Sequence, residues 1–147
     1  DVDQGRWRWR VRDLTLLQSS QRNPSITVQL SIRPNSPPLQ SVTIRAGGND
    51  EGGTRGSPCH GFFPEEPQIV LEVQGSTPSI QITAHSSSDT LLAIRLPNGT
   101  FFCDDDGGGG VNPAITLNSA MGRYEVFVGT FQREDQGTPA TVFVRKR

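Results

Sequence analysis

Short runs in which apolar and polar residues alternate one for one recur along most of this chain. Such alternation places apolar side chains on one face of an extended segment, so it predicts half-buried β-strands and not helices. Turn-forming residues separate the runs, and the composition supplies them, with 16 Gly and 11 Pro among 147 residues. The segments predicted as strands are 6–12, 25–33, 42–46, 69–73, 79–85, 91–96, 101–102, 114–117, 124–131 and 141–144.

Many short strands at nearly regular spacing, with no convincing helix between them, predict a sandwich or a barrel. We expect an all-β antiparallel β-sandwich over residues 42–147 and, over residues 1–41, an N-terminal extension with an arm and added strands. Turns are expected at 75–78 and 118–122. The Pro-Asn-Gly sequence at 97–99 predicts a hairpin with a primed turn, because Asn and Gly tolerate positive φ.

Two cysteines, Cys59 and Cys103, suit either one disulfide or two buried thiols. Each is next to a Gly-rich loop at the end of an apolar run, and we favour the disulfide. Such a bond would close a loop of roughly 45 residues, for which chain entropy predicts about 4 kcal/mol of stabilisation. It would also indicate an oxidising compartment.

The acidic stretch after residue 103 predicts a calcium site. Asp104, Asp105 and Asp106 are followed by four glycines and then by Asn112, while Asp89 opens the paired strand. Calcium takes six to eight oxygen ligands and prefers carboxylates and carbonyls. We expect Asp104, Asp106 and Asn112 as the first ligands, with Asp89 and Asp105 second. The alternative is a solvated acidic turn, although three adjacent like charges repel one another in a way that a cation would relieve.

From about residue 42 to the end, a series of residues follows one family pattern in order and spacing. The matching residues are Gly47, Gly48, Gly56, Cys59, Gly61, Pro67, Leu71, Asp89, Thr90, Leu91, Ile94, Pro97, Asn98, Gly99, Asp104, Asp105, Asn112, Pro113, Gly122, Tyr124, Val126, Val128 and Gly129. On these residues the chain resembles the bacterial pre-peptidase C-terminal domain family. This resemblance implies a jelly-roll-like β-sandwich that is secreted and non-catalytic. Relatives are usually appended to secreted peptidases and other exported enzymes; some bind calcium, and some bind extracellular matrix or polymer surfaces. Residues 1–41 have no counterpart in the family pattern.

The N-terminal arm, residues 6–12, alternates basic and apolar side chains without a break. One reading is an edge strand of the same sandwich. The other is a strand that pairs with another copy, which would give backbone hydrogen bonds, side-chain pockets and an open head-to-tail filament. The residues predicted for assembly are Trp7, Trp9 and Val11 on one face and Arg6, Arg8 and Arg10 on the other.

Several function classes are not expected. The net charge is −1 with both signs interspersed, which does not favour nucleic acid, and no apolar run approaches membrane-spanning length. Cys59 and His60 are adjacent and would point apart in an extended chain, and no catalytic motif is present, so we expect no enzyme.

We therefore predict a non-catalytic, secreted bacterial module with a structural or adhesive role. It would be stabilised by calcium and one disulfide, and it would self-associate into a filament or surface layer through the arm. The alternative is an accessory domain that targets a separate secreted hydrolase to a polysaccharide or protein polymer.

Overall fold

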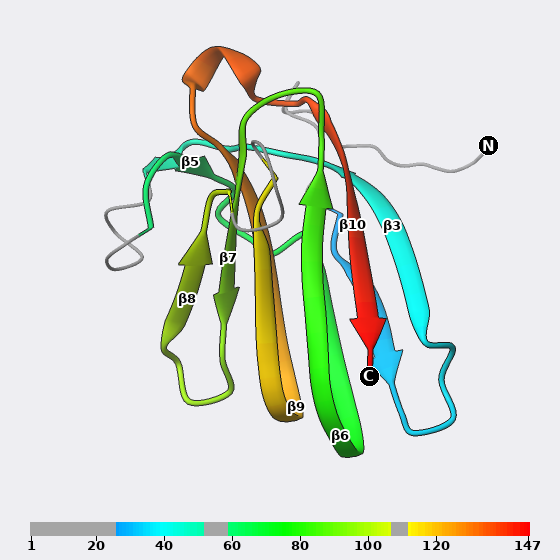
Figure 1. Ribbon diagram of the computed structural model, residues 1–147. Helices are drawn as coiled ribbons and strands as arrows, with labels where there is room; N and C mark the ends of the chain where they lie inside the picture. Colours follow the sequence, from blue (N-terminus) through cyan, green and yellow to red (C-terminus); the bar gives the residue numbers. More distant parts are fainter. Residues whose placement is uncertain (1–25, 52–58, 107–111) are drawn as a thin grey trace, which may run out of the picture.

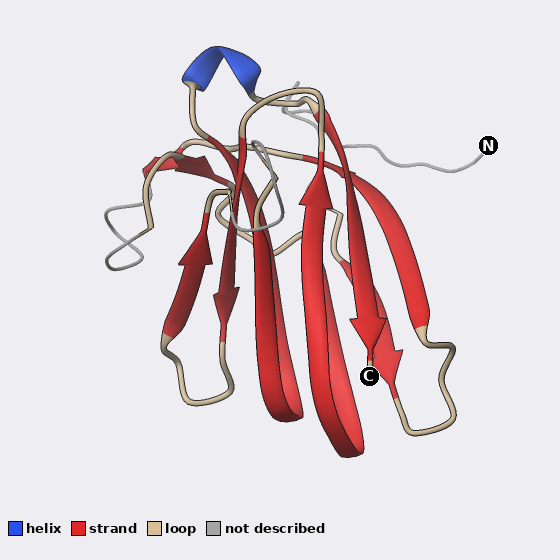
Figure 2. Cartoon of the chain, in the orientation of Figure 1, coloured by secondary structure: helices blue, strands red, loops and turns tan. Residues whose placement is uncertain are grey.

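The computed structural model describes residues 26–51, 59–106 and 112–147, which form strands, turns and one short 3-10 helix (Figures 1 and 2). None of these residues forms a helix long and apolar enough to cross a membrane. The elements are β2 (Val28–Ile32), β3 (Leu39–Arg45), β4 (Asp50–Glu51), β5 (Phe62–Phe63), β6 (Ile69–His85), β7 (Thr90–Arg95), β8 (Phe101–Asp104), β9 (Ala114–Thr130), η3 (Arg133–Asp135) and β10 (Pro139–Lys146).

The nine strands form one continuous hydrogen-bonded sheet that folds over into two layers. The first layer has the order β8, β7, second half of β9, first half of β6, β2. The second layer has the order first half of β9, second half of β6, β10, β3. The prediction of an all-β sandwich is confirmed, although β2 runs parallel to β6, so the sheet is mixed.

The long strands β6 and β9 join the two layers because they bend together. Both bend at the lower end of the molecule in Figure 1, where their register is interrupted between Val73 and Thr77. Gly75 has φ of 82° and Gly122 has φ of 107°, which glycine adopts at little cost. The predicted chain reversals at 75–78 and 118–122 are therefore wrong. The glycines instead bend the paired strands β6 and β9 together. The pairing of the two strands is interrupted at this bend and resumes beyond it.

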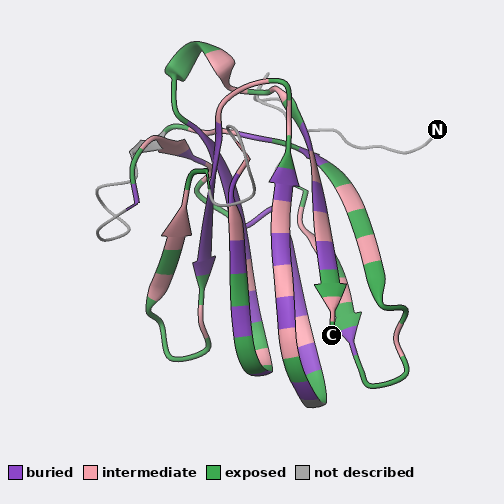
Figure 3. Cartoon of the chain, viewed as in Figure 1, coloured by how far each residue is buried: buried purple, intermediate pink, exposed green. Residues whose placement is uncertain are grey.

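The hydrophobic core lies between the two layers, and inward residues alternate with more exposed ones along β2, β3 and β10 (Figure 3). A second, smaller cluster covers the outer face of the first layer. It contains Cys59, Phe63, Leu91, Ala93 and Phe127. Strand β7 is consequently buried on both faces, which explains why its sequence is apolar almost throughout.

The hairpin at 97–99 is confirmed, but the expected primed turn is wrong. The Leu96 amide donates to the Thr100 carbonyl at 2.8 Å, and the Gly99 amide donates to the Leu96 carbonyl at 2.9 Å. This is a three-residue loop in which Gly99 has φ of 92° and Asn98 does not have positive φ. Asn98 contributes its side-chain oxygen, which accepts from the Thr100 amide at 3.0 Å.

The predicted boundary at residue 41 falls inside β3, which pairs along its length with β10. Strand β2 also comes from the predicted extension and pairs with β6. The described strands of the extension are thus added to the two layers of the sandwich. Residues 1–25 lie outside the described residues.

Candidate functional site

The β7–β8 hairpin brings its acidic residues to one end of the sandwich. Asp89 directly precedes β7, and Asp104 ends β8 opposite Leu92, near the start of β7. Asp105 and Asp106 follow in the adjoining turn. We call this group, Asp89 and residues 104–106, the acidic rim.

Three carboxylates of the acidic rim form a compact cluster. One oxygen from each of Asp104, Asp105 and Asp106 lies within 4.8 Å of the others, a separation that one cation can bridge. Asp104 is half-buried, whereas Asp105 and Asp106 are exposed. Asp104 Oδ2 also accepts from the Ala114 amide at 2.9 Å, so this side chain fixes the start of β9 as well.

Burial and neighbouring like charges raise the pKa values of two carboxylates of the acidic rim. The Asp105 carboxylate, both by its charge and by a hydrogen bond, raises the pKa of Asp106 above the ordinary 3.8. Burial, followed by the charges of Asp105 and Asp135, raises the pKa of Asp89. The folded state therefore holds these carboxylates at an electrostatic cost, which a bound cation would remove.

Asn112, predicted as a first ligand, lies two residues before β9 and is half-buried. Its Oδ1 accepts from the Ser86 amide at 3.4 Å, so the amide oxygen is oriented toward the 86–88 turn. The cluster that the structure brings together is thus residues 104–106 with Asp89 beside it, and the role of Asn112 stays a prediction. Residues 107–111 lie outside the described residues.

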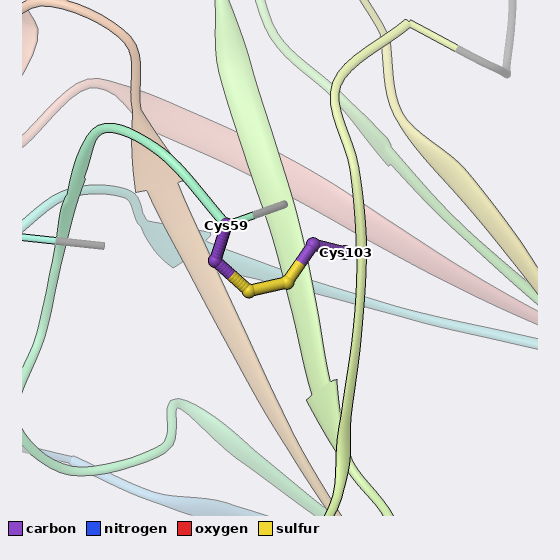
Figure 4. Close-up of a disulfide and its surroundings, with 2 residues drawn as sticks. All are labelled: Cys59 and Cys103. Atoms are coloured by element: carbon purple, nitrogen blue, oxygen red, sulfur yellow. A yellow bond between two sulfur atoms is a disulfide. The ribbon is translucent and has the colours of Figure 1, made fainter. Parts of the chain in front are cut away.

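The predicted disulfide between Cys59 and Cys103 is confirmed, with a Cα–Cα distance of 5.3 Å. Figure 4 shows the two side chains meeting from separate segments, one the chain before β5 and the other β8. The bond ties the covering segment to the strand that carries the acidic rim. Beside it lies a pocket of about 220 Å³, lined by Cys59, His60, Phe63, Leu91, Leu92, Cys103, Asp104, Asp105 and Phe131.

Two further predictions concern chemistry and assembly. Both cysteines are in the disulfide, so neither is free to act as a nucleophile. The residues predicted for assembly, Trp7, Trp9, Val11, Arg6, Arg8 and Arg10, lie outside the described residues. Their role stays a prediction.

The structure also shows features that the sequence did not indicate. The charge of Asp135 in η3 contributes to the raised pKa of Asp89. In the sequence, the whole of β9 lies between Asp135 and residues 104–106. Gln68 is buried and connects two strands: its amide donates to the Val128 carbonyl at 2.9 Å and to the Arg45 carbonyl at 3.1 Å. No local sequence signal marks either residue, because both contacts depend on how distant strands meet.

Comparison of the sequence with family models and with curated proteins found no match. Among solved structures, the fold is similar to the pre-peptidase C-terminal domain of a collagenase from Bacillus anthracis. That similarity has a TM-score of 0.49 at 10% identity and covers 86% of this chain and 100% of that domain. The fold is also similar to PliG of Aeromonas hydrophila, a periplasmic inhibitor of g-type lysozyme. Here the TM-score is 0.46 at 12% identity, covering 82% of this chain and 99% of that one. The first of these structures is from the family that the sequence resembles.

Proposed function

We propose that this chain is a non-catalytic extracellular module with a structural or adhesive role, that calcium bound at the acidic rim stabilises it, and that its N-terminal arm drives self-association. The observation that carries the proposal is the close approach of the carboxylate oxygens of Asp104, Asp105 and Asp106. The Cys59–Cys103 disulfide supports an oxidising, extracellular setting.

Calcium suits the acidic rim for three reasons. The donors are hard carboxylate oxygens, and Asp104 is held in place by the Ala114 amide. Burial together with the charges of Asp105 and Asp135 raises the pKa of Asp89, and the charge of Asp105 raises the pKa of Asp106, so both surroundings oppose ionisation. A divalent cation would reverse this effect and link β7, β8 and the start of β9. A purely structural turn needs Asp and Gly for its geometry but gains nothing from three adjacent charges.

Thermal unfolding in calcium and in excess EDTA tests the site. Extracellular calcium sites bind with dissociation constants of roughly 10⁻⁴ to 10⁻³ M. About 10 mM calcium would then stabilise the folded state by about 1.4–2.7 kcal/mol, which corresponds to a rise in Tm of roughly 3–10 °C. An identical Tm in calcium and in EDTA would remove the calcium proposal.

A matched pair of variants separates calcium binding from a general charge effect. Asp105→Asn with Asp106→Asn should abolish the calcium-dependent rise in Tm. Glu65→Gln with Glu66→Gln removes the same number of charges from an exposed loop and should leave the rise unchanged. Equal responses of the two double variants would show that calcium acts through diffuse charge and not through this cluster.

Self-association through the arm is proposed from its pattern. A segment that alternates Trp7, Trp9 and Val11 with arginines is built to present one apolar face while extended. Light scattering of the purified protein over a range of concentrations should show a rising mass. A Trp7→Ala, Trp9→Ala variant should stay monomeric, whereas an Arg8→Lys variant, which keeps the charge, should associate.

A second function is favoured by the outer face of the second layer. The outward residues of β3, β10 and the second half of β6 include no carboxylate, and they surround Phe143. The ring centroid of Phe143 lies 5.0 Å from that of His85. A sheet face with hydroxyl, amide and aromatic groups and with the outward residues Arg45 and Arg145 suits a polysaccharide that carries no cationic groups, as in a domain that targets a hydrolase to a polymer. Retention on cellulose or chitin that is lost in Phe143→Ala would support this function, and no retention of the wild-type protein would remove it.

A further inference from the structure

The exposed edge of β3 is open to another strand. Within the described residues, β3 pairs with β10 on one side and has no strand partner on the other. Two hydrogen bonds fix which residues face which side: the Ala46 amide donates to the Thr138 carbonyl, and the Lys146 amide donates to the Pro38 carbonyl. Antiparallel pairing alternates, so the even-numbered residues face β10. The backbone groups of Leu39, Ser41 and Thr43 therefore point to the open edge.

Within the described residues, β3 lacks the lysine, proline and bulge that commonly protect an edge strand against strand addition. Natural edge strands are blunted by lysine, proline, bulges or short length. Strand β3 has seven residues, no proline and one charged residue, Arg45 at its end. Its register with β10 runs without interruption from Leu39 to Arg45.

An apolar groove lies beside the same edge, between the two layers. Its volume is about 800 Å³, and most of its exposed lining is apolar, from residues such as Ile26, Val28, Ile44, Pro64 and Pro67. The charged side chains of Arg45 and Glu66 also line it. Ile26 is 73% exposed, so an apolar side chain of this groove remains uncovered within the described residues. A strand added to β3 would direct every second side chain toward this groove.

We propose that the open edge of β3 and this groove accept residues 6–12 of a second copy of the chain. The arm has the same length as β3, and its strict alternation would place Trp7, Trp9 and Val11 over the groove while the arginines remain in solvent. Each copy then offers one donor strand and one acceptor edge, which gives head-to-tail association without closure. The inference rests on the self-association proposed above and names its acceptor.

One substitution blocks the acceptor while sparing the fold. In Ser41→Pro, the lost amide is one that points to the open edge, and proline is tolerated on edge strands for that reason. Ser41→Ala keeps the amide and is the matched control; the Ser41 side chain is exposed. Ile26→Lys is a second variant, which places a cation at the rim of the groove without altering β3. Circular dichroism and thermal unfolding establish that each variant is folded.

The two tryptophans of the chain provide the readout, because both lie in the arm. Wild-type and Ser41→Ala emission should shift to the blue as concentration rises and the arm becomes buried, while Ser41→Pro emission should stay red at every concentration. Ile26→Lys should need at least about tenfold more protein for the same shift, the equivalent of about 1.4 kcal/mol.

Mixing decides whether the arm enters another copy. Ser41→Pro has an intact arm and a blocked edge, whereas the Trp7→Ala, Trp9→Ala variant has an intact edge and no tryptophan emission. Adding the second to the first should shift the emission to the blue and give a species of twice the monomer mass that grows no further.

Three outcomes would overturn the inference in different ways. If Ser41→Pro and Ile26→Lys associate like the wild type while the tryptophan variant does not, the acceptor is wrong but arm-driven association stands. If wild-type emission is blue at every concentration and its mass is that of a monomer, the arm occupies its own edge. If the tryptophan variant associates like the wild type, the proposed role of the arm is itself wrong.

Discussion

Removing the Cys59–Cys103 disulfide should cost this protein a large part of its stability. The bond holds the segment before β5 against β8, and Cys59 is only 2% exposed within the cluster on the outer face of the first layer. Replacing both cysteines by alanine keeps small apolar groups at both positions. The main loss is then the constraint on the unfolded chain.

The size of the effect follows from the sequence separation of 44 residues. Closing a loop of this length lowers the entropy of the unfolded state by about 13 cal/mol/K, or about 4 kcal/mol at 25 °C. For a chain of this size, 1 kcal/mol corresponds to roughly 2–4 °C in Tm. The double variant should therefore unfold roughly 8–16 °C below the wild type.

Urea unfolding followed by circular dichroism measures the change directly. The free energy of unfolding should fall by about 4 kcal/mol, and the m-value should rise because the unfolded chain becomes more extended. Wild-type protein measured in reductant serves as the control and should match the double variant. A loss below about 1 kcal/mol with an unchanged m-value would refute the chain-entropy reasoning.

Three further predictions concern the bend, the C-terminus and pH. Gly122→Ala forces a side chain into φ of 107° and toward Pro97 Cγ at 3.1 Å, so it should lower the free energy of unfolding by about 1–2 kcal/mol in urea titrations. Lys146→Met removes an ammonium that donates to the carbonyls of Arg33, Pro34 and Ser36 at 3.1, 2.7 and 2.7 Å. This variant should lower the free energy of unfolding by about 1–2 kcal/mol, whereas the control Arg145→Met should change it little. In EDTA, protonation of Asp89 and Asp106 should stabilise the folded state, because their pKa values are raised above the ordinary 3.8. This stabilisation should be complete below pH 3.8 and should be lost as the pH rises through the raised pKa values. Calcium should stabilise the protein only above that range, and Tm measured against pH with and without calcium checks both statements.

The sequence predicted the local elements well because their signals are local. Alternation placed strands close to β2 and β10, an apolar run placed one close to β7, and Pro-Asn-Gly placed the hairpin that carries the acidic rim. The three adjacent carboxylates were recognisable for the same reason. Neighbours in sequence at a tight turn remain neighbours in space, so their proximity did not depend on the rest of the fold.

The predictions were wrong where the role of a turn residue depended on pairing with distant parts of the chain. Glycine at positions 75 and 122 predicted two chain reversals, but positive φ also permits a bend within a strand. The result was decided by the continued pairing of β6 with β9 beyond the bend. Likewise, Asn98 was expected to supply positive φ and instead supplies a side-chain acceptor.

The sequence by itself determined the fold class, the cysteine pair and the acidic turn, since each depends on side-chain pattern and short spacing. Only the tertiary structure decided which edge of the described strands stays open, where the groove lies, and that the charge of Asp135 acts on Asp89 of the acidic rim. These features arise where segments far apart in the chain meet. Their pairing is set by burial summed over the whole sandwich, which no single stretch of residues encodes.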